Sequence, residues 1–293
     1  MTGELCRRNY RDLSSVIYFM NPISRVICLI FCVSAWPVLQ GFAQTTAGPA
    51  TYARQATISQ TAGTVHIAAS SPRPLEQTLD ALQQKYGWVV NYEDPQYVSH
   101  TDFIDAPGDP SHAQVPAGGN FGVNIPASTS VPASTSTGPA TPATVPDEEK
   151  ALRLVLDAYN HSKNPGQFEL RGTSQGNFSA VGTAAHDETG AMAQQQVLFD
   201  LLVTLPTEER TIVDTVTLIC QAVAQQSHIS VTLGIYPRTL IAHTQVKAGG
   251  TKVSARELLQ QSLLSAHRNL YWRLLYDPGS KGYFLSIHAV RPA

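Results

Sequence analysis

The stretch Gly172–Gly176 has the spacing of a catalytic motif, the nucleophile elbow G-x-S-x-G. The elbow follows a strand and precedes a helix, so that its serine is exposed where the helix starts. Asp200 and His228 follow Ser174 in the chain order of a hydrolase triad. The residues after Gly176 predict a strand, however, and Gly, Ser and Gln at this spacing are typical of a hairpin turn. We therefore expect a turn with no catalytic residue; the alternative is a secreted serine hydrolase that uses Ser174.

The sequence also lacks the residue spacings that are typical of metal-binding and phosphate-binding sites. The nine histidines are scattered, and no H-x-H or H-E-x-x-H pattern occurs; the nearest pairing is His186-Asp187. Gly249-Gly250 precedes an expected helix but lacks the rest of a phosphate-binding loop. These patterns predict no metal and no cofactor, and together with the turn they predict that the protein is not an enzyme.

The charge balance of the chain argues against two classes of partner. The formal net charge is −2, with 20 basic and 22 acidic residues. No cluster of Lys and Arg is interleaved with aromatic residues, which argues against nucleic acid. No basic amphipathic helix is predicted, so the expected membrane contact is through the N-terminal segment alone, if that segment is not removed.

The N-terminus predicts export. From Met20, which is a candidate for the true start, a short basic region is followed by the apolar run Val26–Leu39 and by small residues before Gln44. This order predicts a signal peptide over residues 1–43, cleaved between Ala43 and Gln44, and hence a periplasmic or secreted protein of a Gram-negative-type envelope. The run is shorter than the roughly 20 residues that span a bilayer. The alternative is an uncleaved segment that anchors the protein in the inner membrane through residues 26–39.

The cysteines agree with this leader. Cys6, Cys28 and Cys32 lie inside it, and Cys220 is then the one cysteine of the mature chain. No intramolecular disulfide is possible in that chain, and we expect a buried structural thiol at Cys220.

Residues 195–293 predict a complete α+β module. The apolar periodicity indicates strand, helix, strand, strand, helix, strand, strand. Thr207 is expected to cap the first helix, with Glu208 and Glu209 in its first turn, and Ser254 with Glu257 forms a capping box for the second. The expected strands are Val197–Leu205, Ile229–Ile235, a weaker one at Thr239–Lys247, and the hairpin Leu270–Tyr276 with Tyr283–Ile287.

Residues 64–187 predict a looser version of the same order. A strand with Val65 and Ile67 precedes a helix that starts at Pro74 and ends at Gly87. The expected elements that follow are a strand at Trp88–Tyr92, a helix at Glu148–His161, and a pair of strands at Phe168–Arg171 and Asn177–Val181.

Residues 106–146 separate the two parts of this first module. They are rich in Pro, Ser, Thr, Ala and Gly and contain no Lys or Arg, so we expect a disordered insertion. Residues 44–63 are expected to be an N-terminal extension. The alternative is a domain boundary within 106–146, but residues 64–94 alone are too few to enclose a core.

The fold class is therefore predicted as α+β, with two small modules. The element order with its leucine-rich helices resembles the short N-terminal domain of secretins and TonB-dependent receptors. The resembling residues are Val216–Val231 and Val253–Ile287 in the second module and Pro74–Pro95 in the first. The resemblance implies a periplasmic recognition module that docks to another envelope protein. From these residues we expect a free-standing protein, without the pore or receptor barrel to which such domains are fused.

One candidate contact surface lies on the terminal hairpin. Tyr271 and Phe284 are expected on the face opposite to the core, where exposed aromatic side chains would mark an interaction site. The favoured hypothesis is a non-enzymatic binding or assembly protein whose partner is an unknown envelope protein, bound by strand addition at a sheet edge. A structural tether that acts through the insertion is a further alternative.

Overall fold

The structure is a computed structural model that describes residues 56–61, 63–106, 113–127, 145–172 and 177–290. The predicted leader with its cleavage site at Ala43 and Gln44, and also Ser174, lie outside the described residues. Residues from Ala47 onward belong to one compact unit. The fold is mixed α+β, which confirms the predicted class.

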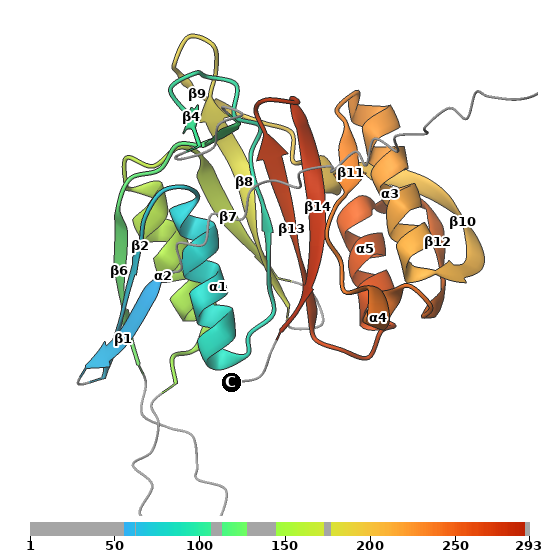
Figure 1. Cartoon of the computed structure of the whole chain (residues 1–293), viewed down its shortest axis with the longest axis horizontal. Coiled ribbons are helices and arrows are strands. Elements are labelled where there is room, and N and C mark those ends of the chain that lie inside the picture. The colour runs from blue at the N-terminus through green and yellow to red at the C-terminus, as the bar shows by residue number, and fades with distance from the viewer. Residues whose placement is uncertain (1–55, 62, 107–112, 128–144, 173–176, 291–293) are drawn as a thin grey trace, which may run out of the picture. The chain divides into compact units, whose positions relative to one another are not determined.

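The first half, residues 56–194, has two helices between a three-stranded sheet and its part of a larger sheet, and it also has a separate pair of short strands (Figure 1). Pro74 occupies the first position of α1, where its missing N–H costs nothing, and Gly87 ends the helix in a left-handed conformation, both as predicted. The Asp147 side chain caps α2. The elements are β1 (Thr57–Thr61), β2 (Thr64–Ala69), α1 (Pro74–Tyr86), β3 (Val90–Glu93), β4 (Phe103–Asp105), β5 (Gln114–Pro116), β6 (Phe121–Pro126), α2 (Glu148–Asn160), β7 (Gln167–Gly172), β8 (Phe178–His186) and β9 (Met192–Gln194).

The second half, residues 197–290, is layered in the same way as the first, with two helices between two groups of strands. The predicted capping box is present, since the Ser254 hydroxyl accepts from the Glu257 amide at 3.2 Å. The predicted terminal hairpin is also present. The elements are the 3₁₀ turn η1 (Leu198–Asp200), β10 (Leu202–Thr211), α3 (Ile212–Ser227), β11 (Val231–Leu233), α4 (Arg238–Ile241), β12 (Gln245–Ser254), α5 (Ala255–Leu264), β13 (Leu270–Asp277) and β14 (Gly282–Ala289).

The two halves repeat one connectivity. In the first half β2 pairs antiparallel with β6, β3 pairs parallel with β8, and β7 pairs antiparallel with β8. In the second half β10 pairs antiparallel with β12, β11 parallel with β14, and β13 antiparallel with β14. Each half therefore places its two longer helices between a sheet that starts the half and a three-stranded group that ends it.

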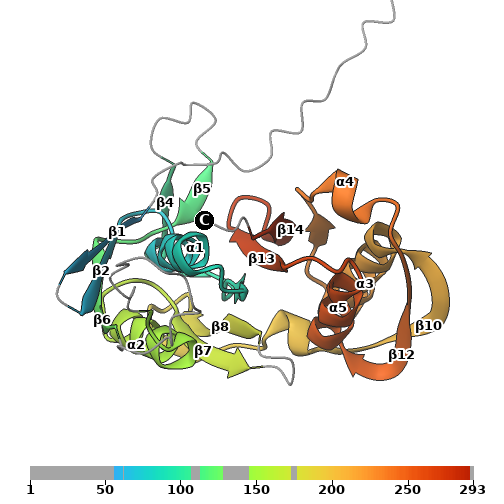
Figure 2. The same ribbon diagram turned by 90° about the horizontal axis from the view of Figure 1, so that it is seen from below.

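The halves meet in a continuous sheet, where β3 pairs in parallel with β13. The strand order is β11-β14-β13-β3-β8-β7, and β9 pairs with β8. Figure 2 shows β7, β8, β13 and β14 of this sheet between α1 and α2 on the left and α3 and α5 on the right. Figure 1 shows α1 and α2 on one side of this sheet and α3 and α5 on the other. Two separate hydrophobic clusters result, one in each half, on opposite faces. The division into two domains stays a prediction, since there are two cores but one shared sheet.

The expectation of disorder throughout residues 106–146 is wrong for the described part of that segment. Strand β6 is an edge strand of the sheet β1-β2-β6, where it pairs with β2, and its residues Phe121, Val123 and Ile125 are buried. They alternate with exposed positions, which is the period of a strand with one buried face. The surrounding Pro- and Ser-rich composition obscured this alternation in the sequence. Strand β1 likewise falls within the predicted N-terminal extension.

The predicted start of the second half is also corrected. Strand β10 continues through Pro206 to Thr211, and α3 begins at Ile212 with the Thr211 side chain as its cap. Thr207 therefore caps nothing, and Glu208 lies on a strand. Proline is tolerated because the register shifts between Leu205 and Glu208 at a bulge.

The segment between β11 and α5 differs in a similar way. Residues 238–241 form the short helix α4, whereas a weak strand was expected from Thr239. Strand β12 begins at Gln245 and contains the glycine pair Gly249-Gly250. Gly249 has φ 155°, and a Cβ there would lie 2.5 Å from the Pro206 carbonyl oxygen, so the bulge in β10 requires glycine at this point.

Candidate functional site

The junction between β3 and β13 contains Arg273, the most deeply buried basic side chain of the described residues. Arg273 is 1 % exposed and pairs in register with Tyr92. Its Nη1 donates to the Val90 carbonyl oxygen at 2.6 Å, and its Nη2 donates to Asp80 and Gln83 on α1. Arg273 points away from the core of its own half, and the helix of the other half covers it.

A second ion pair crosses the junction, and here the residue on the junction strand comes from the first half and the residue that covers it comes from the second. Glu93 is 1 % exposed and accepts from Arg256 on α5 at 2.6 Å and from the Phe199 amide at 3.1 Å. Arg256 also bonds Asp200, which in turn pairs with Arg171 on β7. Each half therefore covers a charged residue that the other half presents.

Asp94 completes the junction just beyond β3. Its carboxylate accepts from Arg73 at 3.0 Å, from the Tyr276 amide at 3.0 Å and from the Tyr92 hydroxyl at 2.7 Å. Its backbone N–H donates to the Leu274 carbonyl oxygen at 2.9 Å. Because buried charges must be paired and hydrogen-bonded, these contacts fix the register in which the two halves join.

Burial also shifts ionisation at and near this junction. Desolvation and the neighbouring Asp80 carboxylate raise the pKa of Glu76 to about 7. Burial lowers the pKa of His288, and the Arg273 charge lowers it further. Cys220 is buried as predicted, and desolvation raises the pKa of its thiol to about 12, so it is mostly uncharged at neutral pH.

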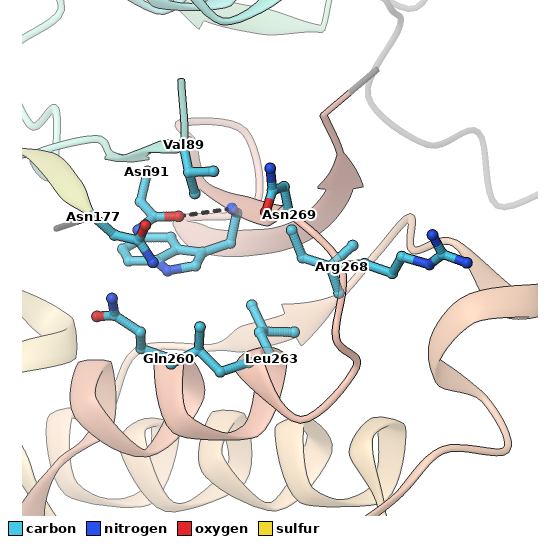
Figure 3. Close-up of a pocket in the computed structure, with 10 residues that line it drawn as sticks. Val89, Asn91, Asn177, Gln260, Leu263, Arg268 and Asn269 are labelled. Carbon is cyan, nitrogen blue, oxygen red and sulfur yellow. Dashed lines mark hydrogen bonds between the residues drawn. The ribbon is translucent and has the colours of Figure 1, made fainter. Parts of the chain in front are cut away.

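A small recess of about 60 Å³ opens where β13, β3 and α5 approach one another (Figure 3). Figure 3 shows Gln260 and Leu263 on α5, across the recess from Val89 and Asn91. The Asn91 Oδ1 accepts from the Trp272 amide at 3.1 Å. The polar residues of the lining are Asn91, Asn177, Gln260, Arg268, Asn269 and Trp272.

The floor of this recess has one unsatisfied donor. The indole Nε1 of Trp272 is buried without a hydrogen-bond partner among the described residues. Amides, an indole N–H and one guanidinium can hydrogen-bond a polar group that enters. They do not supply a general acid paired with a general base, so we assign no chemistry to the recess.

Two residues of the hypothetical triad, Asp200 and His228, have other structural roles. Asp200 bonds Arg171 and Arg256, and His228 ends α3 in a left-handed conformation. The segment after the G-x-S-x-G motif is β8, a strand that pairs with β7 as the hairpin interpretation expected. Ser174 itself lies outside the described residues, so the prediction that it is not a nucleophile stays a prediction.

The aromatic patch on the terminal hairpin is half-buried rather than exposed. Tyr271 and Phe284 lie on one face of the hairpin, as expected. The ring of Tyr271 stacks on His288 at 5.2 Å and holds the Arg273 guanidinium at 4.5 Å. The role of these two residues in partner contact stays a prediction.

The open ends of the shared sheet are the remaining candidate surfaces, and no local pattern of residues predicts them. Among the described residues β7 pairs with β8 alone at one end, and β11 pairs with β14 alone at the other. Ile235, just after β11, is 59 % exposed. A groove runs beside β7, lined by α2 residues including Arg153 and the 42 % exposed Leu154.

Searches for other known features give no further assignment. The described residues contain no group of three or more His, Cys, Asp or Glu placed to hold a metal ion. In the same part of the chain, no helix has the length and apolar character needed to cross a membrane. No protein-family model, curated protein or solved structure matches the chain.

Proposed function

We propose that this chain is an exported, non-enzymatic binding or assembly protein of the cell envelope, built from two modules similar to the short N-terminal domain of secretins and TonB-dependent receptors. Strand addition at an open edge of the shared sheet is the mode of binding. The partner is a protein of the cell envelope.

One observation supports this proposal above the others. Each half has the element order on which the resemblance rests, and both halves use the same strand pairing. The junction of β3 with β13 also shows that an edge of this module accepts a further strand. Edge strands bind partners because their unpaired N–H and C=O groups require hydrogen bonds.

Photo-crosslinking tests the binding mode. A photoreactive residue placed at Ile235 or at Glu169 of β7 reports on the open edges, and one at Glu188, in the exposed turn between β8 and β9, is the control. We expect discrete adducts from the edge positions in intact cells and none from Glu188. Equal adducts at all three positions, or none at the edges, contradict strand addition.

Export is tested separately. Cell fractionation and mass spectrometry of the purified protein should show an envelope protein whose N-terminus is Gln44. Recovery of intact residues 26–39 in a membrane fraction indicates the anchored alternative. A cytoplasmic protein with residues 1–43 intact contradicts the proposal.

A further inference from the structure

We infer that the partner at the open edges is a second copy of this chain, with β7 of one molecule pairing in parallel with β11 of the next. The inference rests on the proposed function, strand addition at an edge. Its template is the internal junction, because β7 corresponds to β13 and β11 corresponds to β3 in the repeated connectivity.

The correspondence is fixed by the helix ends. Gly87 and His228 both end their helices with positive φ, 72° and 60°. Three residues after each cap, Val90 pairs with Phe178 and Val231 pairs with Tyr283. These pairs align the two halves residue by residue. Leu170 on β7 corresponds to Leu274 on β13, and Leu233 on β11 corresponds to Tyr92 on β3.

The strand directions agree with the template. Along the shared sheet β11 is parallel to β14, β13 runs against β14, β3 and β8 run parallel to β13, and β7 runs against β8. Strands β7 and β11 therefore point the same way, as β3 and β13 do. A second molecule in the same orientation extends the sheet, which makes the contact head-to-tail and open-ended.

The edge of β7 is bound by a side-chain amide at the position that corresponds to Trp272, but this amide belongs to α2 of the same half and not to an incoming strand. At the junction, the Trp272 N–H is bound by the Asn91 side chain, and backbone pairing occurs at Leu274. On β7, the N–H and C=O of Phe168 are bound by the Asn160 side chain at 2.9 and 2.8 Å. Alternate residues of a strand point the same way, so the backbone of Leu170 faces outward as well.

The edge of β11 is accessible. Gly234 takes the place of Glu93, and the exposed Ile235 takes the place of Asp94, whose N–H bonds the incoming strand at the junction. A glycine leaves room above this edge for the incoming molecule, since it has no side chain.

The charges differ from the template in a way that a mutation can exploit. Glu169 takes the place of Arg273, and its side chain is 61 % exposed. Gln221, seven residues before His228, takes the place of Asp80, seven residues before Gly87. The native contact thus lacks the ion pair of the template, and we expect association that is weak and dependent on concentration.

Sedimentation equilibrium of the purified protein tests this arrangement. The average mass of the wild type should rise with concentration. Gln221→Asp alone should weaken association, because the new carboxylate faces Glu169 of the neighbour. A mixture of Glu169→Arg with Gln221→Asp should associate about tenfold more tightly than the wild type, because it reproduces the pair of Arg273 with Asp80. Arg171 pairs with Glu169 at 3.6 Å and also with Asp200, so Glu169→Arg removes one partner of Arg171 and leaves the other.

Two controls locate the contact. Glu209→Arg, an exposed charge reversal on β10, should give no gain when mixed with Gln221→Asp. Ile235→Pro removes the edge N–H and should reduce association, with its melting temperature measured to confirm folding.

Two results overturn the inference. One is a wild type that keeps the mass of a monomer at every concentration. The other is association that the edge variants leave unchanged, which assigns it to another surface. If edge crosslinks to a different protein are found in either case, the proposed function stands without this inference.

Discussion

Arg256 illustrates how single residues hold the two halves together. It lies on α5 of the second half, yet its 2.6 Å partner is Glu93 on β3 of the first half. Both side chains are nearly inaccessible to water, so each charge depends on the other for its solvation.

We expect Arg256→Met to destabilise the protein by about 3–5 kcal/mol, because it leaves the Glu93 carboxylate buried and unpaired. Arg153→Met is the matched control, since Arg153 pairs with Glu149 on the surface of α2. That exposed pair should contribute less than about 1 kcal/mol. Urea denaturation measures both values, and equal losses in the two variants contradict the assigned role of the junction.

Glu76 predicts a dependence of stability on pH. Its folded-state pKa of about 7 is above the ordinary value of 4.5, so folding favours the protonated form. Its contribution is therefore fully present below about pH 4.5 and is lost as the pH rises through 7. Glu76→Gln should stabilise the protein at pH 8 by as much as about 3 kcal/mol and have little effect at pH 4.

The control for this change is Glu257→Gln, which alters an acid in the first turn of α5. Glutamine also suits the third position of a capping box, so we expect little change in stability at either pH. Thermal melting at pH 4 and pH 8 measures the difference between the variants. A gain for Glu76→Gln that is the same at both values contradicts the raised pKa.

At the scale of elements, the hydrophobic cluster of the first half includes side chains of β6. The amino-acid composition around this strand did not indicate it. Strand β6 pairs with β2 over six positions and covers α2 with Phe121, Val123 and Ile125. Its alternation covers only a few residues, and the flanking segments have the composition of a linker.

Deletion of residues 107–144 should therefore unfold the first half, although the composition of that segment led us to expect almost no effect. Within β6, Ile125→Ala should cost about 2–5 kcal/mol, the usual range for a large buried aliphatic side chain. Asn124→Ala, at an exposed position of the same strand, is the control. Circular dichroism during thermal melting measures both, and a stable deletion variant contradicts the role of β6.

At the scale of the whole molecule, the second half has a hydrophobic cluster made almost entirely of its own residues. A fragment of residues 195–293 should therefore fold alone and melt cooperatively. It should be less stable than in the full chain, because Arg273 loses Asp80 and the edge of β13 is uncovered.

Leu259→Ala in this fragment should cost about 2–5 kcal/mol, since the side chain is fully buried between α5 and its neighbours. Near- and far-ultraviolet circular dichroism would follow the melting. If the fragment remains unfolded while the full chain is stable, the two halves depend on each other and are not separate domains.

The sequence by itself determined the elements whose signals are local. The predicted features were the cap residues Pro74, Gly87 and Ser254, the helices α1, α2 and α5, and the terminal hairpin. Each of them depends on residues that are close in the chain. The α+β class followed from the alternation of these periodicities.

Only the tertiary structure decided how the halves join. Three polar residues of the junction strands would be exposed in a single module, namely Arg273, Glu93 and Asn91. They are buried because the two modules lie on opposite faces of one sheet, so that each covers the strands of the other. Strand pairing between β3 and β13 joins residues about 180 positions apart, such as Asn91 and Trp272. Local periodicity contains no information about a neighbour that distant, and the burial of a polar residue depends on what covers it.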